Sequence, residues 1–407
     1  MKQERIYPRF TVTKKAEISI KAGHPWVYGE EITAGENVEN GSAVDVISQK
    51  GSYLGTGIYS EKSKIRIRLL TRNANDRLDE AFFTRRISYA LDYRATVMGE
   101  DICASRLIFG EADGIPGLTV DYYDGIVSVQ VLSYGIEIRK DMIFRALTGE
   151  LLRRNMKFSG IFERNDVAIR ELEGLEEYKG WYERDFAPHV SSPVTEIKEN
   201  GIIYKVDVEN GQKTGFFLDQ KYNRLAVSKI AKGKKVLDCF THTGSFALNA
   251  AMGGAAHVTA VDVSSQAIET AKANAARNGL DGRMDFLCTD VFDLLPSLCE
   301  SRADYDMIIL DPPAFTKSRK TISGAERGYK EINYRAMKLL PRGGYLATCS
   351  CSHFMDNRLF VRMLESAAAD ADVSLKLIEA RRQSPDHPTL LSVPETDYLK
   401  FYLFQII

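Results

Sequence analysis

YDMIILDPPAF, residues 305–315, is the stretch of sequence that decides the fold of the C-terminal half of this chain. Its first part, residues 305–310, is a short and nearly continuous apolar run, typical of a strand buried on both faces of a parallel sheet. Asp311 then stands at the carboxyl end of that strand, where open α/β sheets bind their ligands. Pro312 and Pro313 stiffen the turn and keep a helix from starting directly after it. We therefore expect a ligand site at this turn.

A strand-then-helix pattern surrounds this stretch from Lys235 onward. Helical segments with short loops separate the apolar runs, which implies a parallel sheet with right-handed crossovers. The runs that predict strands before Asp311 are residues 236–240, 258–262 and 284–288. Two later segments, residues 374–378 and 398–404, suggest a closing pair of strands with an antiparallel edge. The fold class is thus α/β for this part of the chain.

The first part of the chain has a different sequence pattern. Short apolar segments separated by glycine turns predict a small β-barrel over residues 1–73. The segment 65–70 alternates apolar and basic residues, so we expect Arg66 and Arg68 to point outward from one strand face. Helical and strand patterns mixed over residues 74–187 predict a central α+β domain. Residues 188–193 look like a linker, so the third domain spans residues 188–407.

Composition and charge narrow the class of protein. The chain has 407 residues, of which 44% are hydrophobic and 27% charged, values that exclude extensive disorder. No apolar run approaches a membrane span, and no apolar segment follows the first residues, so we expect a cytoplasmic protein without a membrane partner. The six cysteines and six histidines lack metal-ligand spacing, and we expect reduced thiols and no metal. Residues 1–75 carry a formal charge of +4 and the remainder −5, so a basic N-terminal module could contact phosphates.

Three acidic residues at successive strand ends predict a cofactor site. The loop from Asp238 to Phe246 contains a single glycine, Gly244, which disfavours the glycine-rich fingerprint of NAD sites. One glycine suffices for a ligand without a pyrophosphate, such as S-adenosylmethionine. Asp262 could accept hydrogen bonds from ribose hydroxyls, and Asp290 could receive the adenine amino group. Each aspartate alone could instead cap the following helix.

These motifs resemble those of the RlmI-like large-subunit (23S) rRNA cytosine-C5 methyltransferase family, which has an N-terminal PUA domain. The resemblance rests on the Asp238 loop, on Asp262, Asp290 and Asp311-Pro312-Pro313, and on Ser350-Cys351-Ser352. Residues 24–28, 110–117 and 213–220 are similar to the PUA, central and pre-strand segments of that family. The resemblance implies a class I (Rossmann-like) methyltransferase domain after a PUA barrel and a central α+β domain. It also implies S-adenosyl-L-methionine as cofactor and rRNA, in the large subunit or its precursor, as partner.

The resemblance further implies which residues contact the cofactor. In the segment before the first strand, Lys213 would meet the methionine carboxylate, Phe217 would pack on the ligand, and Gln220 and Arg224 would fix the loop. The remaining expected cofactor contacts are Asp238, Phe240, Thr241, Gly244, Asp262, Val263, Asp290, Val291 and Asp311. Outside the family context, Lys213 could equally be an exposed lysine in a turn.

Methylation of cytosine at carbon 5 requires a nucleophile, because that carbon is unreactive until a thiolate has added to carbon 6. Cys351 follows the next predicted strand after the Asp311 strand, which places it at the same crevice. Cys349 is its rival, since residues two apart in a strand point to the same side. Asp311 would hydrogen-bond the cytosine amino group and, when protonated, ring nitrogen 3. The resemblance favours Cys351 as nucleophile.

The segment after the Asp311 turn predicts contacts with RNA. Phe315 could stack on an extruded base, although it could equally be a core residue. Basic residues interleaved with tyrosines follow it, a pattern suited to phosphates and stacked bases. With the barrel arginines, the expected RNA contacts are Arg66, Arg68, Phe315, Lys317, Arg327 and Tyr329. A solvated loop and helix face is the plain alternative.

Two other functions fit parts of the pattern. An Asp-Pro-Pro-aromatic turn also serves enzymes that methylate exocyclic nitrogens of RNA bases without covalent catalysis. A chain of this kind could also be a non-catalytic RNA-binding assembly factor. The sequence leaves the oligomeric state open, with a homodimer as one alternative.

Overall fold

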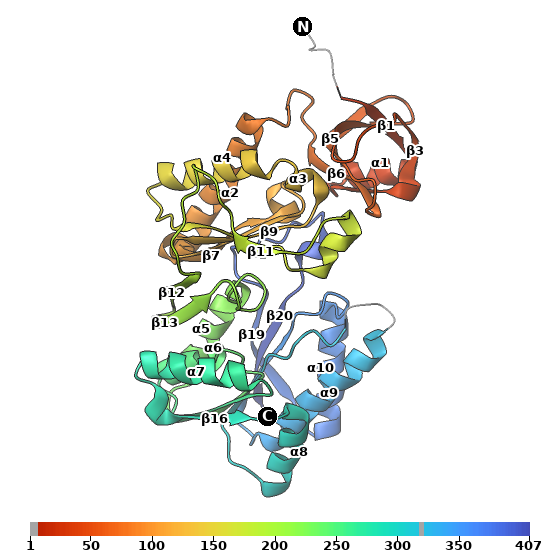
Figure 1. The fold of residues 1–407 in the computed structure, drawn as a ribbon. Coiled ribbons are helices and arrows are strands. Elements are labelled where there is room, and N and C mark those ends of the chain that lie inside the picture. Colours follow the sequence, from red (N-terminus) through yellow and green to blue (C-terminus); the bar gives the residue numbers. More distant parts are fainter. Residues whose placement is uncertain (1–6, 317–320) are drawn as a thin grey trace. The chain divides into compact units, whose positions relative to one another are not determined.

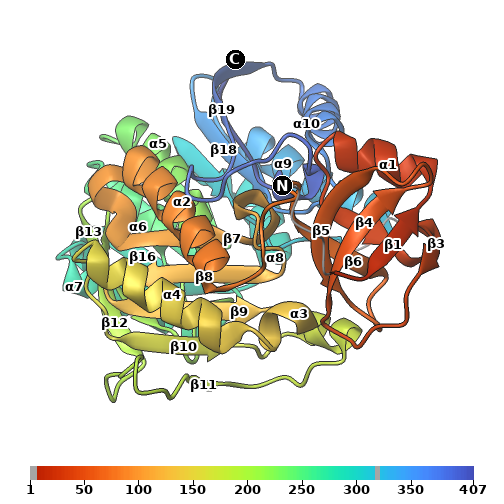
Figure 2. The same cartoon turned by 90° about the horizontal axis from the view of Figure 1, so that it is seen from above.

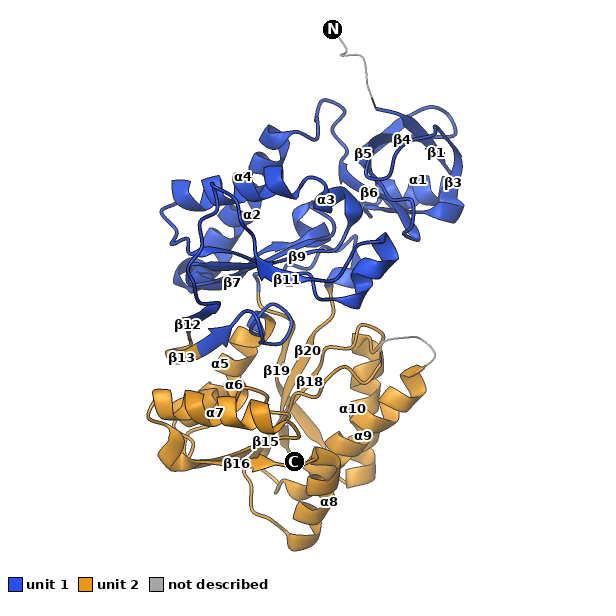
Figure 3. Cartoon of the chain, in the orientation of Figure 1, with its two compact units in different colours: residues 1–197, 205–218, 385–396 blue, residues 198–204, 219–384, 397–407 orange. Residues whose placement is uncertain are grey.

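The computed structural model describes residues 7–316 and 321–407. The chain forms two compact units, coloured separately in Figure 3. The first unit contains residues 1–197, 205–218 and 385–396, and the second contains residues 198–204, 219–384 and 397–407. The three domain boundaries expected from the sequence remain predictions, but one feature was not foreseen. Residues 385–396, late in the chain, belong to the first unit.

The first unit begins with a six-stranded sheet in the order β2-β6-β5-β4-β1-β3. Its strands curl into a small barrel (Figure 2). The apolar core of this sheet includes Val12, Val46 and Ile67. Thr13 begins the helix of this sheet, because its hydroxyl accepts a hydrogen bond from the backbone N–H of Ala16. The elements are β1 Arg9–Val12, α1 Lys14–Lys21, β2 Trp26–Tyr28, β3 Ile32–Gly35, β4 Ala43–Ser48, β5 Tyr53–Tyr59 and β6 Ile65–Thr71.

A five-stranded sheet in the order β11-β10-β9-β8-β7 follows in the same unit. Helices α2 and α4 lie against this sheet (Figure 1). Their buried side chains, such as Phe83, Leu91 and Phe144, belong to the same core as those of the sheet. Ile58 and Leu70 of the first sheet join this core, so the two sheets share buried apolar surface. The elements are α2 Glu80–Met98, β7 Ala104–Phe109, β8 Leu118–Tyr123, β9 Ile126–Val131, α3 Tyr134–Glu137, α4 Lys140–Arg153, β10 Gly160–Arg164 and β11 Lys179–Trp181. Strands β12 Val194–Glu199 and β13 Ile202–Asp207 form a separate pair with residues in both units.

The second unit is built on a seven-stranded sheet in the order β16-β15-β14-β17-β18-β20-β19. Strands β14 to β18 are parallel, and β20 runs antiparallel to both β18 and β19. Helices cover both faces of this sheet (Figure 1). The strands are β14 Lys235–Cys239, β15 His257–Asp262, β16 Met284–Cys288, β17 Met307–Leu310, β18 Tyr345–Ser350, β19 Leu375–Arg381 and β20 Lys400–Ile406. The helices are α5 Lys221–Ile230, α6 Ser245–Met252, α7 Ser265–Arg277, α8 Val291–Ser301, α9 Ile322–Leu339 and α10 Asn357–Ala371.

The strand order of this sheet fixes where a ligand can bind. After β14 the chain goes first to β15 and β16 on one side and later to β17 and β18 on the other. Such a reversal opens a crevice beyond the carboxyl ends of the strands on either side of it. The predicted parallel strands, their α/β class and the closing antiparallel pair are confirmed. Asp238 and Asp311 therefore lie at the two strands that border the reversal.

No helix within residues 7–316 and 321–407 combines the length and the apolar character needed to cross a membrane. Over the same residues, His, Cys, Asp and Glu side chains form no group of three or more that could hold a metal ion.

Candidate active site

Asp238 lies on β14 at the strand reversal and is fully buried. Its Oδ2 accepts hydrogen bonds from the Thr241 hydroxyl at 2.6 Å and from the backbone N–H of Ala247 at 2.9 Å. Its Oδ1 has no hydrogen-bond partner among the described residues. Burial and, more weakly, the nearby Asp311 and Asp262 carboxylates raise the pKa of Asp238 to about 7. A buried carboxylate oxygen without a donor is a binding position for a cationic group.

The loop after β14 holds an unusual backbone. Phe240 and His242 adopt φ angles of +65° and +51°, although neither is glycine. Such residues are uncommon and cluster at ligand-binding sites, where the surrounding structure over-determines them. Gly244 has φ +82°, and a Cβ atom there would lie 3.0 Å from the Cβ of Ala271. The glycine expected at this position is thus required by both backbone conformation and space.

Asp262 ends β15 and fixes the other side of this loop. Its two carboxylate oxygens accept 2.9 Å hydrogen bonds from the backbone N–H groups of His242 and Ser264. The carboxylate is therefore held in place while it stays half-exposed. Val263, the next residue, is 71% exposed although it is apolar. An exposed valine beside a fixed carboxylate is suited to a ligand that has a flat apolar part and hydroxyl groups.

Asp290 occupies the N-cap of α8, and its Oδ1 accepts a 2.8 Å hydrogen bond from the backbone N–H of Phe292. The helix-capping alternative is therefore realised at this position. β16 ends two residues earlier, at Cys288, so Asp290 stands in the loop beyond the strand and not on it. Its carboxylate is exposed, while the side chain of Val291 is buried. Capping of α8 uses the Oδ1 of Asp290 and leaves its Oδ2 accessible.

Asp311 follows β17, and its Oδ1 accepts a 3.0 Å hydrogen bond from the side-chain amide of Gln220. Gln220 is held in turn by Asn223, whose amide donates to the Gln220 Oε1 at 2.6 Å. Burial and then the nearby Asp219 carboxylate raise the pKa of Asp311 to about 6. The helix-capping alternative does not apply, because α9 begins only at Ile322. Asp311 is thus a half-buried carboxyl group that can titrate close to neutral pH.

The two rival cysteines have different surroundings. Cys349 lies within β18, is fully buried, and is near enough to Asp311 and Gln220 for both side chains to influence its pKa. Its pKa is raised well above the ordinary value by burial and by the Asp311 charge, so it is a protonated thiol. Cys351 follows the end of β18 and is partly exposed. Because β18 pairs in parallel with β17, Cys351 and Asp311 come from neighbouring strand ends of one crevice edge.

The residues after Asp311 that were expected to contact RNA differ in their exposure. Phe315 is half-buried, and its ring lies 4.6 Å from that of Tyr329 and 5.8 Å from that of Phe292. Tyr329 is fully buried, and its hydroxyl lies 2.9 Å from the Ser352 hydroxyl. The structure corrects its expected role, since a core side chain of α9 offers no stacking surface. Arg327 is exposed, and Lys317 lies outside the described residues.

The segment before the first strand also differs from expectation. Arg224 is buried and forms a two-pronged ion pair with Glu199, at 2.6 and 2.9 Å. Its guanidinium is a structural anchor of the second unit and is not presented to a ligand. Lys213 and Phe217 belong to the first unit, where the Lys213 Nζ lies 4.4 Å from the centre of the Phe217 ring. Their contacts with a cofactor remain predictions.

The barrel arginines are not free surface charges, which corrects another expectation. Arg68 is only 13% exposed at its side chain and forms a 2.8 Å ion pair with buried Glu173. Arg66 donates hydrogen bonds to the backbone oxygens of Ser60 and Glu61. Strand alternation does place both on one face, but Arg68 is paired there with Glu173 of the 3-10 helix Ala168–Glu173, and Arg66 bonds to the loop that follows β5. The sequence pattern could not reveal this, because the partner Glu173 is 105 residues away.

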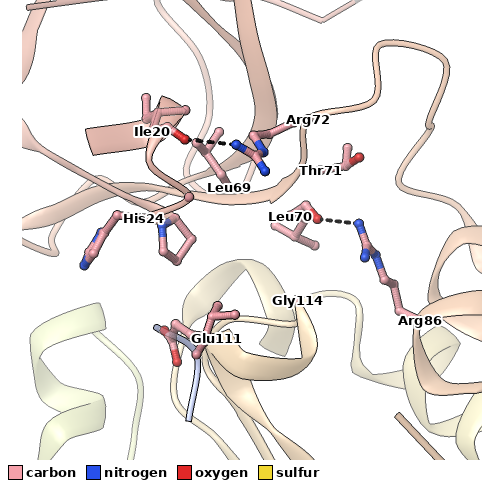
Figure 4. Close-up of a pocket in the computed structure, with 12 residues that line it drawn as sticks. Ile20, His24, Leu69, Leu70, Thr71, Arg72, Arg86, Glu111 and Gly114 are labelled. Atoms are coloured by element: carbon pink, nitrogen blue, oxygen red, sulfur yellow. Dashed lines mark hydrogen bonds between the residues drawn. The ribbon is translucent and has the colours of Figure 1, made fainter. Parts of the chain in front are cut away.

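Other arginines line a pocket in the first unit. Residues from the end of α1, the end of β6, α2 and residues 111–114 surround it (Figure 4). Arg72 donates to the backbone oxygen of Ile20 at 3.3 Å, and Arg86 donates to that of Leu70 at 3.1 Å. Within the described part of the chain, neither guanidinium has a carboxylate within ion-pair distance. Sequence reasoning overlooked both residues because no strand alternation marks them.

Comparison with known proteins identifies the chemistry of the crevice. A model of S-adenosylmethionine-dependent methyltransferases matches residues 186–405, and a PUA-like domain model matches residues 10–72. Ribosomal RNA large subunit methyltransferase I of Klebsiella pneumoniae (strain 342) is 38% identical over 99% of this chain and 100% of its own length. The protein of that name from Escherichia coli (strain UTI89 / UPEC) is 37% identical over 98% and 99%. This chain belongs to the S-adenosylmethionine-dependent methyltransferase family.

Two solved structures share the fold of this methyltransferase. A candidate methyltransferase from Streptococcus mutans superposes with a TM-score of 0.81 at 23% identity, covering 98% of this chain and 99% of the other. A crystal structure of a candidate methyltransferase complexed with S-adenosylhomocysteine gives a TM-score of 0.83, with the same identity and coverage. The expected PUA domain, the class I fold and the S-adenosylmethionine cofactor are confirmed.

The residues of the crevice fit S-adenosylmethionine. The free Oδ1 of Asp238 suits the ammonium of its amino-acid part, and the fixed Asp262 carboxylate suits ribose hydroxyls. Exposed Val263 suits the adenine ring. When bound, the cofactor supplies a methyl group on a sulfonium.

One buried charge beside this crevice was missed by the sequence reasoning. Lys400 lies in β20, directly opposite Ser350 of β18, and is 6% exposed. The signal was present, because Lys400 is the single charged residue of the apolar segment 398–407. We interpreted that segment only as a closing strand.

Proposed function

We propose that this methyltransferase methylates carbon 5 of a cytosine in large-subunit (23S) rRNA. The observation that carries the proposal is that a titratable carboxyl group and an accessible thiol stand at the ends of two neighbouring strands. Asp311 and Cys351 follow the ends of neighbouring parallel strands, and cytosine-C5 chemistry requires both kinds of group. The large-subunit rRNA substrate is taken from the names of relatives that match the chain over nearly its full length.

The proposed mechanism assigns a step to each group. The Cys351 thiolate adds to carbon 6 of cytosine, which makes carbon 5 nucleophilic, and carbon 5 then takes the methyl group. Loss of the carbon 5 proton and breaking of the carbon 6–sulfur bond release the product. Asp311 binds the cytosine amino group and, in its protonated form, ring nitrogen 3. Its pKa of about 6 keeps both protonation states accessible near neutral pH.

We assign the cofactor contacts in the same proposal. Asp238 accepts from the methionine ammonium, Asp262 from the ribose hydroxyls, and Asp290 from the adenine amino group, with the Val291 N–H meeting a ring nitrogen. Gln220 acts through Asp311, which it holds at 3.0 Å. Lys213 and Phe217, from the segment before the first strand, are proposed contacts of the methionine part. Phe240, Thr241 and Gly244 shape the loop around it.

We further propose that the barrel domain, residues 1–73, contributes to rRNA binding beside a central domain, 74–187, and a catalytic domain, 188–407. Phe315, with its half-buried ring, and exposed Arg327 would contact the RNA near the target base. An enzyme with this substrate works in the cytoplasm. Light scattering of the purified enzyme would distinguish a monomer from the homodimer alternative.

Mass-spectrometric mapping of rRNA tests the proposal. Ribosomal RNA from cells with and without this gene should differ by one 5-methylcytidine in the large-subunit RNA. Adding back the purified enzyme with S-adenosylmethionine should restore that mark. A missing N-methylated base would instead show amino-group methylation, and an unchanged set of marks would indicate a non-catalytic assembly factor.

A further inference from the structure

Lys400 is a buried lysine whose backbone and Nζ contact the residues on either side of Cys351. Its backbone is paired with Ser350, the residue before Cys351. Its Nζ donates a 2.7 Å hydrogen bond to the backbone oxygen of Ser352, the residue after Cys351. A second hydrogen bond, of 2.8 Å, goes to the backbone oxygen of Tyr398. The lysine is thereby fixed at both ends of the three-residue segment that contains the cysteine.

The Nζ of Lys400 forms no ion pair with a carboxylate of the described residues. Throughout residues 7–316 and 321–407, no Asp or Glu oxygen lies within ion-pair distance of its Nζ. The groups that act on it electrostatically are Cys351 first and then, more weakly, Asp397 before β20 and Asp356 at the start of α10. Burial lowers the pKa of Lys400 to about 8. Tyr329 of α9 faces the same cysteine, and burial raises the pKa of its phenol.

The hydrogen bonds of Lys400 suit a group that exchanges a proton. A neutral amine has two N–H groups and a lone pair, whereas an ammonium has three N–H groups. Two N–H groups are used by the Ser352 and Tyr398 carbonyls, and both bonds can persist in either protonation state. The third position alone changes between a lone pair and an N–H. A proton can therefore be gained or lost there without rearrangement of the segment.

We propose that Lys400 accepts the thiol proton of Cys351 and holds the resulting thiolate. The proton moves from Sγ to the Nζ lone pair, which gives a thiolate–ammonium pair without net change in charge. The thiolate then adds to carbon 6, and it is regenerated beside the ammonium when the carbon 6–sulfur bond breaks. The carbon 5 proton leaves to a separate acceptor. This inference rests on Cys351 being the nucleophile of the proposed function.

The pH dependence of Cys351 alkylation tests the inference without RNA or cofactor. The full-length enzyme is treated with iodoacetamide between pH 5.5 and 9.5, and each cysteine is followed by peptide mass spectrometry. Cys288, which is exposed, serves as the reference within the same molecule. We expect Cys351 to reach half-maximal reactivity at least about one pH unit below Cys288, since an adjacent cation lowers a thiol pKa. Equal or higher values for Cys351 would overturn the inference, even if every variant below failed to fold.

The variant K400M and the control K376M complete the test. Lys376 is an exposed lysine on the neighbouring strand β19. In folded K400M, Cys351 alkylation at pH 7 should slow by about tenfold or more, the loss expected for a rise of one pKa unit in the thiol. Cys288 alkylation and the K376M profile should be unchanged. An unaltered Cys351 profile in folded K400M would refute the role of Lys400, whereas methylation by C351A would refute the proposed function separately.

Discussion

At the residue scale, the carboxylate of Asp238 suits a bound cation but is unfavourable for the fold of the ligand-free enzyme. Its Oδ1 is buried without a donor among the described residues, and its pKa is raised to about 7 by burial. The folded state therefore favours the protonated form. Protonated Asp238 stabilises the folded state. Its contribution to the unfolding free energy is fully present below the unfolded pKa of about 3.9 and is lost as the pH rises through 7.

D238N should accordingly make the ligand-free enzyme more stable while it weakens cofactor binding. The gain in unfolding free energy should grow between pH 4 and pH 8 and reach at most about 4 kcal/mol, because each pKa unit corresponds to about 1.4 kcal/mol. S-adenosylmethionine binding, measured by calorimetry, should weaken by at least about tenfold. D304N is the control, since Asp304 is exposed and its ion pair among residues 7–316 and 321–407 is with Lys235, at 2.6 Å. A stability difference that does not vary with pH would contradict the buried charge.

The two cysteines make the second prediction at this scale. RNA containing 5-fluorocytosine should trap the enzyme, because carbon 5 then has no proton to lose. We expect the covalent complex to persist in C349A on a denaturing gel and to vanish in C351A. The reason is that Cys349 is a fully buried thiol, whereas Cys351 is accessible. The opposite pattern would make Cys349 the nucleophile.

At the element scale, the ion pair between Arg68 and Glu173 joins strand β6 to the 3-10 helix Ala168–Glu173. The Glu173 carboxylate also accepts hydrogen bonds from the Ser60 hydroxyl and the Tyr134 N–H. R68M should lower the unfolding free energy in urea by about 3 kcal/mol, because it leaves a buried charge without a partner. R68M/E173Q should recover most of this loss.

R66M is the matched control for this element, because the hydrogen bonds of Arg66 within the described residues go to backbone oxygens of residues 60 and 61. Its loss should cost about 1 kcal/mol. Equal destabilisation by R66M and R68M would show that the ion pair adds nothing specific.

At the scale of the whole molecule, charge is divided unevenly along the chain, +4 over residues 1–75 and −5 over the rest. Deleting the barrel would be a poor test of its role, since Ile58 and Leu70 are part of the central core. Arg72 offers a better one, because it is exposed beside the pocket of Figure 4.

R72Q should weaken rRNA binding and reduce the slope of log affinity against log salt by about 1, the value for one lost phosphate contact. R153Q removes an arginine that is paired with Glu150 at 2.6 Å on α4, and it should change neither quantity. Filter binding at several salt concentrations provides the measurement. An R72Q slope equal to that of the unchanged enzyme would exclude Arg72 from RNA contact.

The sequence by itself determined the α/β class, the succession of strands along the second half of the chain and the positions of Asp238, Asp262 and Asp311. These features follow from local periodicity and from the rule that parallel strands present their carboxyl ends at one edge. It also indicated Gly244, where a positive φ and a close neighbour require glycine.

Only the tertiary structure decided which charged and aromatic side chains are available. Arg68 was expected on an outward strand face and Arg224 beside the cofactor, but each meets a buried glutamate distant along the chain. Tyr329 belongs to a basic segment, yet its helix turns it into the core. Lys400 and Cys351 become neighbours because β20 pairs with β18. Periodicity specifies the face of an element on which a side chain lies, whereas long-range packing decides what covers that face.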